Sequence, residues 1–172
     1  MKNLKVVFFG TPDFAKESLA AIHQSNHQVV GVVTVADKPS GRGQKLTESP
    51  VKKYAVENNL TVFQPEKLRN PEFLEQIRNL DADVFVVVAF RMMPKILFEM
   101  PKIGTFNLHA SLLPDYRGAA PINFAIINGE EKTGATTFFI NEKIDEGNIL
   151  LQEELPISPD ENAGSLHDRL ME

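Results

Sequence analysis

Short apolar runs alternate with segments of helical periodicity, and this alternation constrains the fold more than any other feature of the sequence. Residues 4–9 and 84–89 are nearly continuous apolar runs, which are typical of strands buried on both faces of a parallel sheet. Ser49-Pro50 and Asn70-Pro71 each combine a capping residue with a proline suited to the first helical position. Strand–helix alternation implies right-handed crossovers. We therefore predict an α/β fold with a doubly wound, mostly parallel sheet.

The remaining elements follow from the same patterns. Thr11 and Pro12 predict the start of the first helix, with Thr11 as its N-cap. Residues 38–44, rich in glycine and basic side chains, are expected to form an irregular loop. Strand-like runs are found at residues 29–35, 60–63, 105–109, 135–140 and 149–155, and a helical run at residues 122–127. A short polar segment joins the last two strands, which favours an antiparallel addition at the C-terminal end of the sheet.

Composition narrows the functional classes. The longest apolar run, residues 84–90, has seven residues, far short of the ~20 needed to cross a bilayer, so no membrane association is expected. Because cysteine is absent, there is no disulfide framework or thiolate nucleophile, and a reducing cytoplasm is the expected setting.

The net charge of −5 argues against a broad nucleic-acid-binding face. A local basic patch remains, since residues 38–53 hold one acidic side chain, Glu48, against Lys38, Arg42, Lys45, Lys52 and Lys53.

Asn107-Leu108-His109 ends a strand-like run and carries the first candidate chemistry. Side chains alternate along a strand, so Asn107 and His109 should share one face. An amide can stabilise a developing oxyanion and an imidazole can exchange a proton, a combination suited to acyl transfer. Ligands of open parallel sheets bind beyond the carboxyl ends of the strands. The alternative is that both are ordinary polar residues at the end of a strand.

Residues 111–122 read Ser-Leu-Leu-Pro-Asp-Tyr-Arg-Gly-Ala-Ala-Pro-Ile. Together with residues 107–109, they resemble the signature of the 10-formyltetrahydrofolate-dependent formyltransferases. Ile144-Asp145-Glu146-Gly147 matches the loop that carries this family's catalytic aspartate. The resemblance covers essentially the whole chain. It implies a Rossmann-like formyltransferase fold and a catalytic trio of Asn107, His109 and Asp145.

The resemblance also implies the ligand. 10-Formyltetrahydrofolate would donate the formyl group, no metal would be needed, and the folate would lie against residues 111–114 and the loop at residues 89–93. The folate-binding residues implied by this match are Ser111, Leu112, Leu113, Pro114, Phe90, Arg91 and Met92.

Three features bear on the acceptor substrate within this family. Residues 9–15 resemble the opening of members that act on initiator methionyl-tRNA, and they lack the Gly-Ser-rich phosphate loop of the glycinamide ribonucleotide members. Residues 37–46, followed by residues 49–52, look like the basic insertion that meets the tRNA acceptor end, although a solvated charged loop is the alternative. Residues 90–94 depart from the tRNA-directed pattern, because Arg and Met stand where Gly and an aliphatic pair are commoner. The candidate tRNA-binding residues are Lys38, Arg42 and Lys45.

We therefore expect a cytoplasmic, monomeric enzyme that formylates the amino group of initiator methionyl-tRNA. Residues 1–172 would form its catalytic domain. The last residues, 170–172, lie within a helical pattern, so this domain is expected to be truncated, with a tRNA-binding domain beyond it. Two alternatives stay open: a folate-dependent formyltransferase that acts on an amino sugar nucleotide, and a non-catalytic, doubly wound binding module.

Overall fold

The computed structural model describes residues 3–40 and 45–172, and the chain divides into two compact units, Met1–Thr105 and Phe106–Glu172. The first unit is built on a parallel sheet and the second on antiparallel strands. Among the described helices, none is long and apolar enough to cross a bilayer.

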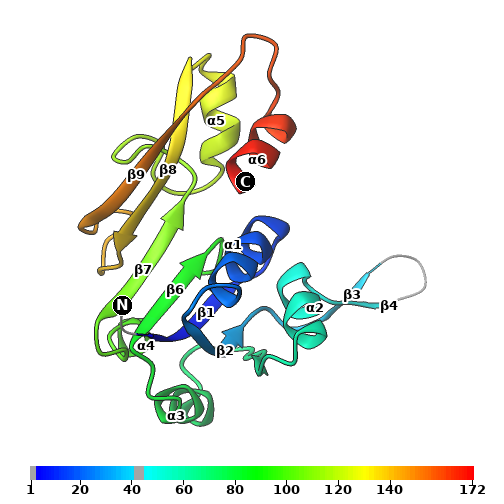
Figure 1. Ribbon diagram of the computed structural model, residues 1–172, viewed down its shortest axis with the longest axis vertical. Helices are drawn as coiled ribbons and strands as arrows, with labels where there is room; N and C mark the ends of the chain where they lie inside the picture. The colour runs from blue at the N-terminus through cyan, green and yellow to red at the C-terminus, as the bar shows by residue number, and fades with distance from the viewer. Residues whose placement is uncertain (1–2, 41–44) are drawn as a thin grey trace. The chain divides into compact units, whose positions relative to one another are not determined.

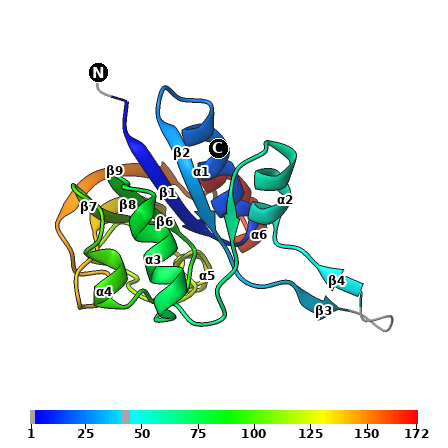
Figure 2. The same ribbon diagram turned by 90° about the horizontal axis from the view of Figure 1, so that it is seen from below.

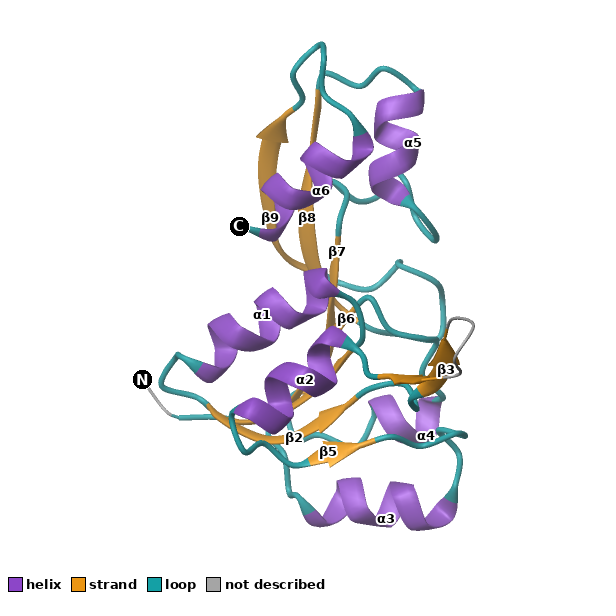
Figure 3. Ribbon diagram, turned by 90° about the vertical axis from the view of Figure 1, so that its right-hand side faces the viewer, coloured by secondary structure: helices purple, strands orange, loops and turns teal. Residues whose placement is uncertain are grey.

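Four parallel strands in the order β5-β2-β1-β6 form the sheet of the first unit. The order runs outward from β1 in both directions, which is the doubly wound arrangement predicted from the sequence. Figures 2 and 3 show α1 and α2 on one face of this sheet and α3 on the other. The elements are β1 Lys5–Gly10, α1 Asp13–His23, β2 Gln28–Val33, α2 Pro50–Glu57, β5 Val62–Phe63, α3 Pro71–Asn79, β6 Val84–Val88 and α4 Lys95–Phe98.

Apolar side chains of the central strands and of the inward helix faces form the core of this unit. All five residues of β6 are buried, as expected for a strand covered on both faces. The helices contribute the positions that periodicity predicts, and the buried members include Ala15 and Leu19 of α1, Val51 and Ala55 of α2, and Phe73, Leu74 and Ile77 of α3.

Two of the three predicted helix caps are confirmed. The Ser49 hydroxyl accepts from the Lys52 backbone N–H at 3.0 Å, and the Asn70 amide oxygen accepts from the Phe73 N–H at 3.1 Å. The prediction for Thr11 is wrong: Pro12 is the N-cap of α1, and no side chain caps the helix. The Thr11 hydroxyl is instead buried without a partner among the described residues.

The basic segment after β2 is also more regular than predicted. β3 Lys38–Ser40 pairs antiparallel with β4 Lys45–Thr47, so the described part of residues 38–44 is a strand and not an irregular loop. Strands of three residues are too short to show an alternating pattern, which explains the error. Figure 1 shows these strands projecting from the end of β2 and the start of α2. Residues 41–44, including Arg42, lie outside the described residues.

Three antiparallel strands and two helices make up the second part of the chain. β8 pairs antiparallel with both β7 and β9, so the predicted antiparallel addition is confirmed. The helices lie side by side, with Ala125 and Leu166 fully buried (Figures 1 and 3). The elements are β7 Gly104–His109, α5 Pro121–Ile127, β8 Lys132–Phe139, β9 Ile149–Pro156 and α6 Ala163–Met171.

The buried hydroxyl of Thr136 ties the loop after β7 to β8 and β9. It donates to the Ser111 carbonyl at 2.7 Å and accepts from the Leu113 N–H at 3.1 Å. The Gln152 side-chain amide, on β9, also donates to it at 2.9 Å. One fully buried hydroxyl therefore serves three polar groups.

We expect Thr136→Val to lower the free energy of unfolding by about 2 kcal/mol or more, because the variant leaves the buried Leu113 N–H without its acceptor. Thr137→Val is the matched control, since the Thr137 hydroxyl makes only a long, exposed contact of 3.4 Å with the Leu151 carbonyl. Urea denaturation of both variants measures the difference. Equal losses of stability would contradict the role given to Thr136.

Candidate active site

All three predicted catalytic side chains lie in the second unit. Asn107 and His109 alternate with Leu108 on β7, and they stand opposite Phe138 and Thr136 of β8. Asp145 lies in the segment between β8 and β9, and one of its carboxylate oxygens is 3.7 Å from Nδ1 of His109. The structure thus brings together an imidazole and a carboxylate that are far apart in the sequence, beside an amide on the same strand.

Backbone groups of residues 116–118 fix both His109 and Asp145. Nε2 of His109 lies 2.8 Å from the carbonyl oxygen of Tyr116, and because a carbonyl can only accept, Nε2 must carry the proton. The Gly118 N–H donates to the Asp145 carboxylate at 2.8 Å. Nδ1 of His109 is therefore the ring nitrogen that faces the carboxylate, and it is the one left for proton exchange.

Tyr116 holds this arrangement from a left-handed backbone conformation, with φ at 56°. Such a conformation is uncommon for a bulky residue and persists only where the surroundings impose it. The phenol of Tyr116 donates to the Glu130 carboxylate and accepts from the Asn128 amide at 2.9 Å. The bond to Glu130 raises the pKa of Tyr116 above its usual value of 10.0, so the phenol remains a donor. These contacts anchor the residue whose carbonyl orients His109.

The loop that carries Asp145 depends on a glycine. A Cβ at Gly147 would lie 1.5 Å from the carbonyl oxygen of Phe139, so only glycine lets this loop approach the end of β8. Arg117 holds the loop from the other side: its Nε donates to the Asp145 carbonyl at 3.0 Å, and its guanidinium pairs with Glu146 at 3.3 Å.

The side-chain amide of Asn107 has a polar atom without a partner among the described residues. Its side-chain oxygen is buried and has no hydrogen-bond partner among the described residues. A buried polar atom without a partner is costly, and functional sites are where such atoms are tolerated. The Asn107 side-chain oxygen is an acceptor and fits a donor group of a ligand, whereas stabilising an oxyanion would use the N–H groups of the same amide. In the described part of the chain, no group of three or more His, Asp or Glu side chains could hold a metal ion.

The implied folate residues of the second unit belong to the loop that Thr136 holds. Ser111 and Leu113 are buried, and the Ser111 hydroxyl donates to the Asp115 carbonyl at 2.7 Å. The Leu113 carbonyl accepts from the Gln152 amide at 2.8 Å. The loop at residues 111–114, which includes Leu112 and Pro114, is thus fixed in the same unit as the trio.

The implied folate residues 90–92 lie in the first unit. The Arg91 guanidinium donates to the Glu66 carbonyl at 2.8 Å and to the Pro65 carbonyl, and it lies 5.6 Å from the centre of the Phe90 ring. The arginine that departs from the commoner pattern therefore ties its loop to the segment after β5. Met92 is 75% exposed.

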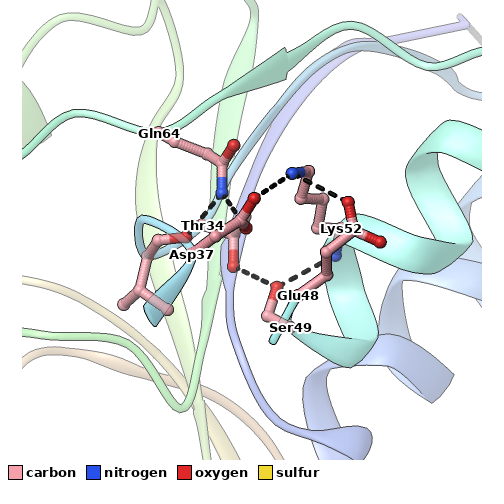
Figure 4. Close-up of polar contacts among 7 residues, drawn as sticks. Thr34, Asp37, Glu48, Ser49, Lys52 and Gln64 are labelled. Carbon is pink, nitrogen blue, oxygen red and sulfur yellow. Dashed lines mark hydrogen bonds and ion pairs between the residues drawn. The ribbon is translucent and has the colours of Figure 1, made fainter. Parts of the chain in front are cut away.

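The basic patch requires one correction. Lys52, counted among its cations, is paired with Asp37 and with Glu48, the latter at 2.9 Å (Figure 4). The bond to Asp37 raises the pKa of Lys52, so the charge is present but is occupied within the protein. Lys38 and Lys45 lie on β3 and β4, while Arg42 lies outside the described residues.

Sequence reasoning missed the groups that orient the trio. Tyr116, Arg117 and Gly118 belong to the segment that carries the resemblance, but the contacting groups of Tyr116 and Gly118 are backbone atoms, which every residue has. Their positive φ values, 56° for Tyr116 and 84° for Gly118, cannot be read from periodicity. Gly118, two residues after Tyr116, was the only sequence signal for a left-handed backbone in this segment.

Comparisons with known proteins identify relatives of this chain. The family model described as formyl transferase matches residues 4–172. Methionyl-tRNA formyltransferase from Flavobacterium johnsoniae is 60% identical over 171 residues, which are 99% of this chain and 54% of that protein. The enzyme of the same name from Clostridioides difficile is 53% identical over 169 residues, which are 98% of this chain and 55% of that protein. The chain spans about half the length of the curated relatives it matches.

Solved structures share the fold over nearly the whole chain. Phosphoribosylglycinamide formyltransferase from Bacillus halodurans has a TM-score of 0.79 at 22% identity, covering 96% of this chain and 87% of that one. The sugar 3N-formyltransferase WlaRD, solved with dTDP and 5-N-formyl-THF, has a TM-score of 0.68 at 26% identity, covering 99% of this chain and 58% of that one. With the family model matching residues 4–172, this chain belongs to the formyl transferase family.

Proposed function

We propose that this chain is the catalytic part of a cytoplasmic enzyme that transfers a formyl group from 10-formyltetrahydrofolate to the amino group of initiator methionyl-tRNA. The observation that carries the proposal is the placement of His109 between the Tyr116 carbonyl and the Asp145 carboxylate, with Asn107 on the same strand. The names of relatives 52–60% identical to this chain support methionyl-tRNA as the acceptor.

In the proposed reaction, the free α-amine of the methionyl ester attacks the formyl carbon of the folate. A new C–N bond forms, and the carbonyl oxygen becomes an oxyanion. Nε2 of His109 is committed to Tyr116, so Nδ1–H and the Asn107 amide are the donors for that oxygen. One such preorganised donor contributes about 100-fold to the rate.

Asp145 has two roles in this scheme. It stabilises the positive charge on His109 and accepts a proton from the attacking amine, directly or through water. One carboxylate oxygen is bonded to the Gly118 N–H, which leaves Oδ1 as the proton acceptor. The oxyanion then collapses to a carbonyl, the bond between the formyl carbon and N10 breaks, and the departing nitrogen of tetrahydrofolate takes the Nδ1 proton of cationic His109. No covalent enzyme intermediate is needed, because the amine is already a competent nucleophile.

A second candidate function is favoured by one observation. The structural relative WlaRD, 26% identical to this chain, is a sugar N-formyltransferase. An amino sugar nucleotide presents the same nucleophile, a free amine, to the same trio. The substrate must therefore be decided by groups outside the trio, and we infer that Lys38, Arg42 and Lys45 select tRNA. We also infer that a more basic C-terminal region supplies much of the tRNA affinity, since this chain has a net charge of −5.

Asn107→Ala and Asp145→Ala are each expected to lower kcat/KM for formyl transfer by about 100-fold or more, because each removes a group that acts on the transition state. Asp160→Ala, which removes an exposed carboxylate elsewhere in the same unit, should leave the rate unchanged. Steady-state kinetics with circular dichroism as a folding check measures this. A variant of the trio that keeps activity within threefold of wild type would lose its place in the mechanism.

The acceptor is tested by comparing charged initiator tRNA with amino sugar nucleotides as substrates of the full-length protein. We expect turnover of the tRNA alone, a steep fall of activity with added salt, and a loss of about tenfold in kcat/KM for tRNA in Arg42→Ala. Binding of a folate analogue should stay unchanged in that variant. Faster turnover of a sugar nucleotide, insensitive to Arg42 and to salt, would establish the second candidate function.

A further inference from the structure

The β3–β4 hairpin leaves the first unit through two acidic residues. Asp37 directly precedes β3 and Glu48 directly follows β4, so they mark the two ends of the hairpin. The ammonium of Lys52, in the first turns of α2, bonds to the carboxylates of both residues, with the Glu48 contact at 2.9 Å (Figure 4). A single cation therefore joins the entering and leaving strands.

Further hydrogen bonds attach these ends to the parallel sheet. The Gln64 side-chain amide donates to Asp37 at 2.7 Å and to the Val35 carbonyl at 2.9 Å. The hydroxyls of Ser49 and Thr34 bond to each other at 2.8 Å and are buried. Figure 4 shows this network spanning the segment after β2, the start of α2 and the segment after β5.

Two of the three charges of this network are largely shielded from solvent. The Lys52 and Asp37 side chains are 16% and 20% exposed, whereas Glu48 is 43% exposed and Lys53, the residue after Lys52, is also exposed. The bond to Lys52 lowers the pKa of Asp37, and the bond to Asp37 raises the pKa of Lys52, so both groups keep their charges over the physiological range. An ammonium held by two carboxylates would have to break these bonds to reach a phosphate.

We propose that Lys52 is a positioning residue, which joins Asp37 to Glu48 and fixes the direction in which the β3–β4 hairpin leaves the sheet. The inference rests on the proposed function in one respect: the hairpin is the segment that meets the acceptor end of the tRNA. Lys52 then contributes to tRNA use through the hairpin and not through contact with a phosphate. Asp37, although acidic, therefore favours tRNA use as Lys52 does, because it holds the same end of the hairpin.

Two substitutions that remove charges of opposite sign distinguish a positioning role of Lys52 from direct contact with a phosphate. Lys52→Met removes a positive charge and Asp37→Asn removes a negative one, so a purely electrostatic effect on tRNA would have opposite signs in the two variants. The positioning role predicts the same sign, because Lys52→Met removes this ion pair and Asp37→Asn weakens it by removing the carboxylate charge. Lys53→Met is the matched control, since it makes the same charge change at the adjacent, exposed position.

The experiment measures full-length variants in two ways: hydrogen–deuterium exchange in peptides that contain β3 and β4, and KM and kcat for charged initiator tRNA. Lys52→Met and Asp37→Asn are each expected to speed exchange about tenfold and to raise KM for tRNA about tenfold, with kcat little changed, because each loses the ion pair between Lys52 and Asp37. Lys53→Met should leave exchange at the wild-type rate, and Lys52→Arg should restore it, because a guanidinium can also bond to two carboxylates. Unchanged binding of a folate analogue shows that each variant is folded.

Two results would overturn the inference. One is a higher KM in Lys52→Met with a lower KM in Asp37→Asn and wild-type exchange in both, which would make Lys52 a direct phosphate contact. The other is wild-type exchange and wild-type KM in both variants. A failure of the proposed function is distinguishable: exchange would still respond to Lys52→Met and Asp37→Asn, while the wild-type protein would not formylate charged tRNA.

Discussion

The hydrogen bond between Nε2 of His109 and the carbonyl of Tyr116 is the contact on which the rest of the candidate site depends. It assigns the proton to Nε2, turns Nδ1 toward Asp145 and leaves that nitrogen for chemistry. The backbone N–H of Gly118, two residues after Tyr116, holds the Asp145 carboxylate. Acid and base are thus oriented by one short piece of main chain, whose left-handed residue Tyr116 is anchored by its own phenol.

The division of the chain into two units matches a division of proposed roles. The second unit contains the proposed catalytic trio and the backbone groups that orient it, whereas the implied folate residues 90–92 lie in the first unit. The first unit carries the hairpin and its anchoring network at the ends of a parallel sheet. Under the proposed function, the hairpin would decide the acceptor while the trio supplies the chemistry common to formyl transfer.

The sequence predicted what depends on side-chain patterns and missed what depends on main-chain contacts. Apolar runs located the buried strands, and Ser49 and Asn70 marked helix starts correctly. Alternation placed Asn107 and His109 on one strand, but pairing His109 with Asp145 required the resemblance to a family, because long-range contacts leave no periodic signal. Lys52 belongs to the predicted basic patch by count, and its partner Glu48 stands at the helical i,i+4 spacing, but the pairing with Asp37, 15 residues away, has no such signal. Thr11 was assigned as a cap, but Pro12 occupies that position in the folded chain.

The central claim, that the Tyr116 carbonyl fixes the proton on Nε2 of His109, is tested most directly by ¹⁵N NMR of the imidazole nitrogens in the full-length, isotope-labelled protein. The protein has four histidines, so the His109 signals are assigned by their loss in His109→Gln. The account predicts a protonated Nε2 and a one-bond ¹H–¹⁵N coupling at that atom. An unprotonated Nε2 with the proton on Nδ1 would contradict it, because the Tyr116 carbonyl would then face a nitrogen that cannot donate.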